Sequence, residues 1–451
     1  MGLKLKKRST VMASLLLALT VALTGCGGGN NAEGGNDPAA SGGNGEATSP
    51  ENMKATIKVW DWDEAFLKYM IPEFNKVYPN IKVEYSIVNN VDYLQKLQSG
   101  IASGSEVPDV ILGEMTYRGQ LFDLGVLANL EEAPYNMDKS QLFDYLIPLL
   151  SNSKDELVAV DQQITPGGLA FRRDLAKEYL GTDDPALLEG MLKDWNAFTQ
   201  KGIEVKDKSG GKVVMMSGLG DAFRVLYGQT ASDYIKDKEI DLTSRVKGPL
   251  TDLFNMRDAG ILGKLETDTP AWSASFAKGE TIFYPLAPWG PKWAVAANDK
   301  EGKGRWGLVK APGGGTTVGG TSVSVYKDSK AKEAAWAYVN FVYLSREGTS
   351  KSFEKFGFPP GVKSFYEDND LIEKGSEYDE FFGGQNLMKY FYENVVPEMK
   401  GQSQTKYESF VVNTFNMLYP LFTKDATITA DAALQKYIAE VKNKVQGVTV
   451  K

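Results

Sequence analysis

Carboxylates are the side chains best suited to chemistry in this chain, because its 451 residues include no histidine and a single cysteine, Cys26. The absence of histidine excludes Ser-His-Asp and Cys-His nucleophilic sites and histidine-ligated metals. One cysteine cannot form an internal disulfide or a cysteine-based zinc site. Two kinds of carboxylate chemistry remain: acid pairs of the glycosidase type, and the binding of hard metal ions by oxygen ligands.

Candidate functional side chains follow three predicted strands, at residues 57–60, 107–112 and 157–160. In doubly wound α/β sheets, ligands bind at the carboxyl ends of the strands. The residues that follow the first two strands are therefore expected at one rim of a sheet. The candidates that follow the three strands are Trp62, Asp63, Glu114, Asp161 and Gln162.

Amphipathic helices separate these strands. Phe66, Met70 and Phe74 recur at helical spacing and predict a helix over residues 64–77, and alternating apolar residues predict a strand over residues 81–88. Strands that alternate with helices favour an α/β fold with a mainly parallel sheet in this part of the chain.

The pattern of the remaining chain predicts three crossings between two bodies. The first runs through residues 157–171, a return strand occupies residues 318–325, and a Gly-Phe-Pro-Pro-Gly segment at residues 357–361 forms the third. Helical patterns dominate residues 174–300 and the C-terminal region. The length of the chain fits two domains better than one.

The N-terminus has the pattern of a bacterial lipoprotein signal. Four basic residues within positions 4–8 precede an apolar run at residues 11–23 that is too short to span a bilayer, and Gly25-Cys26 closes the run. We expect cleavage before Cys26 and attachment of a diacylglycerol to its sulfur. The alternative is an ordinary signal peptide with an inert cysteine. Residues 27–50 are rich in Gly, Asn, Ala and Ser and are expected to form a flexible tether.

The order of features resembles the extracellular solute-binding proteins of bacterial ABC importers, family 1, the maltose-binding-like sugar and oligosaccharide receptors. Each matching piece is short, and their order and spacing carry the resemblance. The pieces are residues 57–60, 79–84, 97–112, 125–130 and 276–281, then Pro288-Trp289, Ala311-Pro312, Gly319-Gly320 and residues 332–336.

The resemblance implies an α/β, two-lobed periplasmic-binding-protein-like fold of type II with a multi-crossing hinge. We expect a signal peptide at 1–25 and the lipidated cysteine with its linker at 26–53. The N-terminal lobe is expected to comprise 54–162 plus 317–358, and the C-terminal lobe 163–316 plus 359–451. The chain departs from many relatives at Phe171-Arg172-Arg173, where two arginines near a crossing could favour an acidic sugar.

For a sugar ligand, Trp62 and Trp289 are the preferred stacking platforms, and Trp272 is a further candidate. The C–H face of a pyranose packs on an indole, while its hydroxyls stay free for polar partners. Carboxylates accept charge-assisted hydrogen bonds from such hydroxyls. The alternatives are core tryptophans, and acids that are solvated or cap helices. The proposed hydroxyl acceptors are Asp63, Glu114, Asp161 and Asp221, with Gln162 as a weaker candidate.

The sequence therefore predicts a lipid-anchored receptor at the extracytoplasmic face of the cell membrane that passes a carbohydrate to the transmembrane subunits of an ABC permease. No cofactor, metal or catalytic residue is expected. The net charge of −8 disfavours nucleic acid as a partner. Two alternatives remain open: a secreted carbohydrate-active enzyme that uses paired carboxylates, and a surface adhesin or sensor partner.

Overall fold

The computed structural model describes residues 49–230, 233–236, 238–367 and 369–451. The predicted signal, Cys26 and most of the tether lie outside these residues. In the described part of the chain, no helix has the length and apolar character needed to cross a membrane.

The first sheet has the strand order β2-β1-β3-β12-β4. Its strands are β1 (Ala55–Asp61), β2 (Ile81–Ile87), β3 (Val110–Glu114), β4 (Val160–Asp161) and β12 (Thr321–Val325). β1 runs parallel to β2 and β3, as predicted, whereas β12 runs antiparallel to β3 and β4 because it returns from the second sheet. The sheet is therefore mixed, which the prediction of a mainly parallel sheet did not include.

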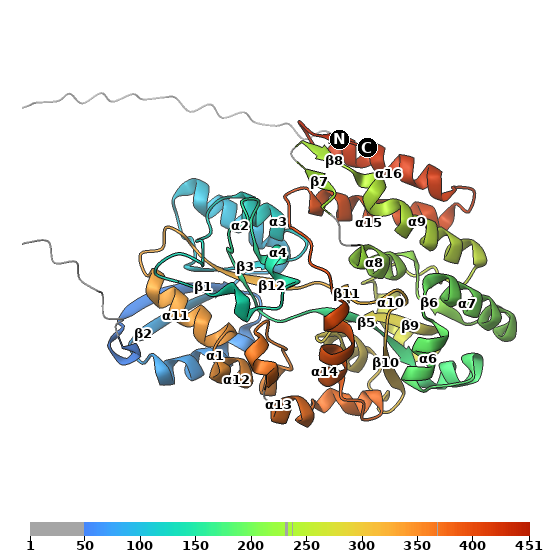
Figure 1. Cartoon of the computed structure of the whole chain (residues 1–451), viewed down its shortest axis with the longest axis horizontal. Coiled ribbons are helices and arrows are strands. Elements are labelled where there is room, and N and C mark those ends of the chain that lie inside the picture. The colour runs from blue at the N-terminus through green and yellow to red at the C-terminus, as the bar shows by residue number, and fades with distance from the viewer. Residues whose placement is uncertain (1–48, 231–232, 237, 368) are drawn as a thin grey trace, which may run out of the picture. The chain divides into compact units, whose positions relative to one another are not determined.

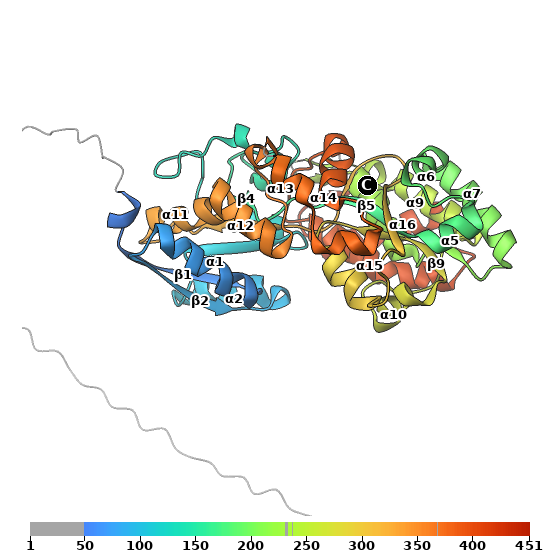
Figure 2. The ribbon, with the colours of Figure 1, turned by 90° about the horizontal axis from the view of Figure 1, so that it is seen from below.

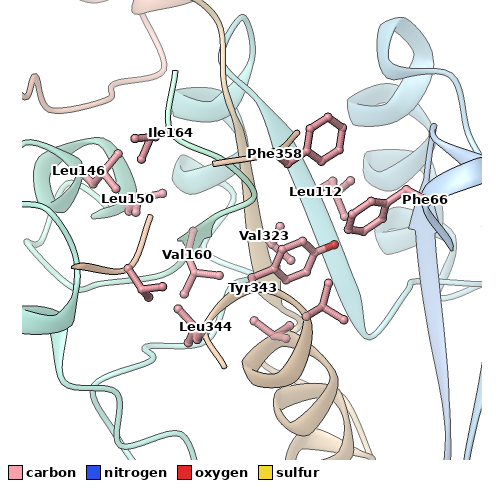
Figure 3. Packing of buried hydrophobic residues seen from close by; sticks show 14 of the residues in the cluster. Phe66, Leu112, Leu146, Leu150, Val160, Ile164, Val323, Tyr343, Leu344 and Phe358 are labelled. Carbon is pink, nitrogen blue, oxygen red and sulfur yellow. The ribbon is translucent and has the colours of Figure 1, made fainter. Parts of the chain in front are cut away.

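Helices α1 (Glu64–Val77), α11 (Lys332–Tyr343) and α12 (Arg346–Phe356) pack together beside this sheet (Figure 1). The Asp63 carboxylate caps α1 by accepting the backbone N–H of Phe66 at 3.0 Å. Phe66, Met70 and Phe74 are buried, as their spacing predicts. Figure 3 shows Phe66 beside Leu112 and Tyr343 in the core. Each such side chain contributes about 1.5–3 kcal/mol on burial.

The second sheet has the order β10-β5-β9-β6, and β11 also pairs with β5. Its strands are β5 (Pro166–Arg172), β6 (Val214–Met216), β9 (Thr281–Leu286), β10 (Trp306–Lys310) and β11 (Thr316–Thr317). Helices that contact one another and enclose a second apolar core accompany this sheet (Figure 1). They are α7 (Trp195–Ser209), α8 (Leu219–Gln229), α9 (Leu242–Ala259), α15 (Glu408–Lys424) and α16 (Ala430–Lys444).

Shorter elements complete the fold. A small sheet has the order β13-β8-β7. The bounds are β7 (Ile235–Lys236), β8 (Glu239–Ile240), β13 (Thr449–Val450), α2 (Asn90–Ser103), α3 (Arg118–Asp123), α4 (Leu146–Leu150), α5 (Arg173–Leu175), α6 (Pro185–Met191), α10 (Pro270–Lys278), α13 (Asn369–Lys374) and α14 (Leu387–Tyr390).

Three segments connect the two sheets and are hydrogen-bonded side by side. The backbone N–H of Gln162 donates to the carbonyl of Thr321 at 2.8 Å, and that of Ile164 donates to Pro359 at 2.7 Å. The predicted lobe boundaries at 162/163, 316/317 and 358/359 stay predictions, and the second of them falls within β11. Residues 359–399, assigned by sequence to the C-terminal lobe, contain α13 and α14, which lie between the two sheets in both views (Figure 1 and Figure 2). This stretch contributes buried side chains to an apolar core that contains residues of both sheets, and it also contacts β5 and β10.

Candidate functional site

A pocket of about 550 Å³ lies between the two sheets. Its walls come from the loop after β3, from the connection that carries β11, from the loop after β9, and from helices α8, α9 and α15. The polar and aromatic residues that line it include Glu114, Thr116, Phe223, Arg224, Tyr227, Arg245, Thr267, Asp268, Trp289, Thr317, Lys400, Gln402, Gln404, Glu408, Asn416 and Tyr419. Both sheets therefore supply side chains to one pocket.

Glu114 and Trp289 are the two predicted site residues that line this pocket. Glu114 ends β3, and its carboxylate accepts the backbone N–H of Thr116 at 2.8 Å. Trp289 is half-buried, and its indole N–H donates to the carbonyl of Val318 at 3.3 Å. This hydrogen bond holds the ring of Trp289, in the loop after β9, against the connection between the sheets. The arrangement presents an aromatic surface and a carboxylate to one space.

The backbone next to Val318 depends on two glycines. Gly319 and Gly320 have φ angles of +70° and +132°. Side chains with a Cβ rarely adopt these angles, whereas glycine does so at little cost. A Cβ on Gly320 would also lie 3.3 Å from Arg118 and 3.2 Å from Thr165. The glycine pair thus lets this connection turn closely past the first sheet.

Asp221 and Trp272 lie behind the pocket wall and do not line it. The fully buried Asp221 carboxylate accepts the indole N–H of Trp272 at 2.8 Å and the hydroxyl of Thr267 at 3.0 Å. The hydroxyl of Ser217 donates to the same carboxylate. Because Thr267 does line the pocket, Asp221 is placed to orient a pocket residue rather than to meet a ligand.

Trp62, Asp63, Asp161 and Gln162 also lie outside the lining of this pocket. Asp63 serves as the cap of α1, which was the alternative considered for acids at such positions. Trp62 packs edge-on against Tyr93 with the ring centroids 5.7 Å apart. The pocket thus supports the predicted ligand contacts of Glu114 and Trp289, and those of the other candidates stay predictions.

Asp161 forms a buried pair with Arg118. Arg118 Nη2 lies 3.6 Å from Asp161 Oδ1, and the two side chains are 1% and 3% exposed. Burial raises the pKa of the Asp161 carboxyl to about 7, although the positive charge of Arg118 acts in the opposite direction. Gln162, the next residue, is also buried. Asp161 and Gln162 thus occupy the connection between the sheets.

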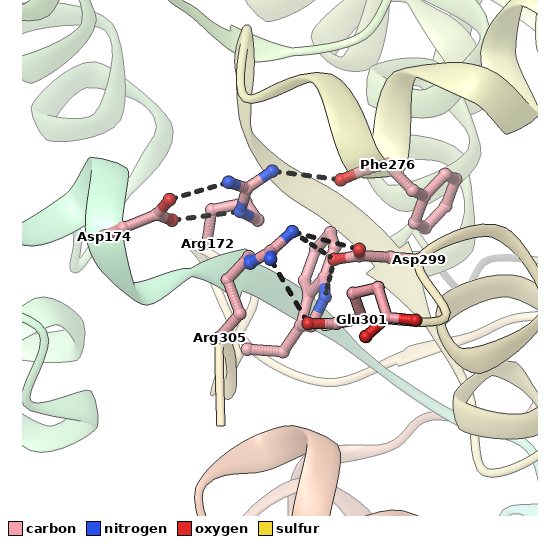
Figure 4. A network of polar contacts seen from close by, with 7 residues as sticks. Arg172, Asp174, Phe276, Asp299, Glu301 and Arg305 are labelled. Carbon is pink, nitrogen blue, oxygen red and sulfur yellow. Dashed lines mark hydrogen bonds and ion pairs between the residues drawn. The ribbon is translucent and has the colours of Figure 1, made fainter. Parts of the chain in front are cut away.

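Arg172 and Arg173, the two arginines near the first crossing, hold the second sheet together. Arg172 donates to both carboxylate oxygens of Asp174 at 2.9 and 2.6 Å, and to the carbonyl of Phe276 at 3.0 Å (Figure 4). Arg173 donates to the carbonyl of Trp306 at 2.6 Å. Neither lines the pocket, so these two residues give no support to an acidic ligand.

A cluster that was not among the predicted site residues is formed by Tyr227, Tyr234, Arg245 and Glu408. The tyrosine hydroxyls donate to the two carboxylate oxygens of Glu408 at 2.7 and 2.5 Å. Burial, and then the nearby charge of Glu408, raises the pKa of the Tyr227 hydroxyl. Three helical positions far apart in sequence meet here, so no strand-end argument finds them. The available signal was a charged residue, Arg245, in the apolar stripe of α9.

Two α/β bodies joined by three connections around a pocket define a two-lobed binding protein. The chain belongs to the family described as bacterial extracellular solute-binding proteins, whose sequence pattern matches residues 69–378. The predicted family and fold are thereby confirmed, and the family is one of binding proteins rather than enzymes.

A curated relative, the arabinooligosaccharide-binding protein of Bacillus subtilis (strain 168), is 22% identical over 430 residues, covering 85% of this chain and 87% of the relative. Solved structures share the fold. An extracellular solute-binding protein of family 1 superposes with a TM-score of 0.77 at 20% identity, covering 86% of this chain and 99% of that one. The sugar-binding protein MalE of Xanthomonas citri gives 0.69 at 19% identity, with coverages of 86% and 96%.

A third solved structure is the galacto-N-biose-/lacto-N-biose I-binding protein of the ABC transporter from Bifidobacterium longum, in complex with lacto-N-biose. It gives a TM-score of 0.68 at 19% identity, covering 88% of this chain and 99% of that one. At these identities the likenesses establish the fold.

Proposed function

We propose that this chain is a receptor that binds a sugar or oligosaccharide in the pocket between its two lobes and delivers it to an ABC importer. The observation that carries the proposal is the pocket itself, to which Glu114 of the first sheet and Trp289 of the loop after β9 both contribute. The relatives named for arabinooligosaccharide and lacto-N-biose support a saccharide as the ligand.

The chemistry of the lining fits a saccharide. The half-buried indole of Trp289 and the ring of Tyr419 offer apolar surface to the C–H face of a pyranose or furanose. Carboxylates and amides, such as Glu114 and Gln402, offer acceptors and donors to its hydroxyls. Small-molecule sites commonly combine an apolar wall with a few placed polar groups in this way.

Closure of the lobes is the proposed mechanism of capture. The lobes are taken to be 54–162 plus 317–358 and 163–316 plus 359–451, with the three connections as the hinge. At the edge of the pocket, the Gln120 side chain of α3 donates to the hydroxyl of Ser409 on α15 at 2.5 Å, and Lys406 pairs with Asp123 at 3.1 Å. A ligand that touches both walls stabilises the closed form, because only differential contacts shift such an equilibrium.

Delivery and anchoring complete the proposal. The permease subunits are the expected partners, and the lipid on Cys26 is expected to hold the protein at the extracytoplasmic face of the membrane. Cys26→Ser tests the anchor: the variant should leave the membrane fraction or remain unprocessed. A mature variant that still partitions with the membrane would contradict a lipid on this cysteine.

A thermal-shift screen of the purified protein tests the central proposal. Arabino-oligosaccharides, lacto-N-biose, malto-oligosaccharides and acidic oligosaccharides form the panel, and product analysis after long incubation checks for turnover. We expect a saturable rise in the melting temperature with at least one saccharide and no product. Turnover would favour the enzyme alternative, and the absence of any shift across the panel would contradict a saccharide receptor.

A further inference from the structure

Arg245 is a buried cation whose hydrogen-bonding capacity is unused. It lines the pocket from α9 and is 2% exposed. Its Nε and Nη1 atoms have no hydrogen-bond partner among the described residues. A buried charged donor without a partner destabilises the folded protein. Buried polar groups in proteins are nearly always hydrogen-bonded, so an unpaired one calls for a partner that the chain itself does not supply.

The immediate surroundings of Arg245 orient its guanidinium without neutralising it. Its central carbon lies 3.8 Å from the ring centroid of Tyr227 and 5.5 Å from that of Tyr234. These faces attract a cation and fix its plane, but they accept no conventional hydrogen bond. Both rings are themselves held by Glu408, through their hydroxyl groups.

Glu408 is the acid of this cluster, and its oxygens already accept other donors. Besides the two tyrosine hydroxyls, the side-chain amide of Gln402 donates to it at 3.2 Å. Neutral donors therefore occupy the carboxylate in place of the guanidinium. The other arginine of the pocket differs, because Arg224 pairs with Asp268 at 3.1 Å. Arg245 is thus the pocket arginine left free for an incoming group.

The chemistry of the missing partner follows from the donor. A guanidinium presents parallel N–H groups in a rigid fork, formed by Nη2 with either Nε or Nη1, that matches the two oxygens of a carboxylate. A single hydroxyl fills one of these positions and leaves the buried charge uncompensated. A carboxylate fills two and neutralises it.

We propose that Arg245 forms an anion subsite that recognises the carboxylate of an acidic sugar residue, such as a uronic acid, within the bound saccharide. This inference rests on the proposed function, since it names the class of saccharide for the same pocket. Tyr227 and Tyr234 act as positioning residues that hold the guanidinium plane, and Glu408 holds the tyrosines.

The test compares ligands that differ in the charged group alone. Oligogalacturonates and their methyl esters, and glucuronic-acid-substituted and unsubstituted xylo-oligosaccharides, are titrated into the wild-type protein together with the neutral panel of the screen. We expect an acidic saccharide to bind at least tenfold more tightly than its neutral counterpart. The difference in affinity between the acidic and the neutral saccharide should shrink at high salt, because salt screens charges that solvent can reach.

Variants of Arg245 separate recognition from structure. Arg245→Gln should reduce affinity for the acidic saccharide roughly tenfold to hundredfold, as expected for the loss of two charge-assisted hydrogen bonds. It should also abolish the preference for acid over ester, while Arg245→Lys should retain part of it. Lys247→Gln, an exposed position on the same helix, serves as the matched control and should bind as the wild type does.

The outcomes are distinguishable. One outcome is that a neutral saccharide binds more tightly than the acidic ones and that Arg245→Gln does not change this preference. This outcome would overturn the anion subsite but would still support a saccharide receptor. No binding to any neutral or acidic saccharide would overturn both. A loss of apo stability in Arg245→Gln with the acid-to-ester ratio intact would assign Arg245 a structural role and contradict the proposal.

Discussion

A Cβ atom placed on Gly119 of α3 would lie 2.0 Å from the carbonyl oxygen of Thr405. The backbone of the first lobe thus touches the segment that leads into α15, which packs in the core of the second lobe. No side chain fits between them without movement of one backbone, and the neighbouring Gln120–Ser409 hydrogen bond lies at the same contact. This contact therefore depends on the distance between the lobes.

Gly119→Ala should hold the lobes apart. Overpacking at a close contact costs about 1–3 kcal/mol, and here it would destabilise the closed form relative to the open form. We expect a larger radius of gyration by small-angle scattering and an affinity reduced by a corresponding amount. Gly190→Ala on α6, where an added Cβ meets nothing within 4 Å, is the control. An unchanged radius and affinity in Gly119→Ala would argue against a closing contact at this position.

Trp289→Ala should weaken saccharide binding by about 1–3 kcal/mol, the range for removing a buried aromatic contact. Trp293→Ala is the matched control, since Trp293 is 57% exposed and does not line the pocket between the sheets. Titration calorimetry measures both. Equal affinities for the two variants would remove Trp289 from the binding surface.

Asp221→Asn should reduce the free energy of unfolding by about 1–3 kcal/mol, because a buried carboxylate that accepts three donors is replaced by an amide. The affinity for the saccharide should change less than the stability does, because Asp221 affects the pocket only by orienting Thr267. Urea unfolding measures the effect, with exposed Asp207→Asn on α7 as the control. A large loss of affinity at full stability would instead assign Asp221 a direct contact with the ligand.

Asp161 should make stability depend on pH. Its pKa in the folded protein is raised from 3.8 to about 7, so the folded state binds more protons than the unfolded state between these values. Stability from this group is therefore lost as pH rises through that window. Asp161→Asn should flatten the fall of unfolding free energy between about pH 4 and pH 7, relative to wild type and to the exposed control Asp144→Asn. Parallel curves would contradict a raised pKa.

Local periodicity was sufficient to predict much of the fold. The helix over residues 64–77 matches α1 in both bounds, because its cap and its apolar spacing are local features. The predicted strand at 107–112 instead forms β3 at Val110–Glu114, and the strand at 157–160 shrinks to Val160–Asp161. Both strands pair with the returning β12, and pairing between segments so far apart in the sequence leaves no local trace.

The site was less accessible to sequence reasoning. Glu114 and Trp289, which line the pocket, were proposed because each follows a strand and strand ends gather ligands; their contact with a ligand stays a prediction. Tyr227, Arg245 and Glu408 come from three helices, and only tertiary packing brings them together. The sequence context of Asp221 does not reveal that Ser217, Thr267 and Trp272 donate hydrogen bonds to its carboxylate behind the pocket wall.

Hydrogen exchange with and without the strongest ligand of the screen tests the central claim most directly. A saccharide held between the lobes should slow exchange in segments of both walls together: residues 114–116 of the first lobe, the 317–319 connection, and residues 400–409 of the second. Exposed segments away from the pocket, such as residues 207–212 at the end of α7, should be unchanged. Protection confined to one lobe, or to a surface outside these segments, would contradict capture in the pocket between the lobes.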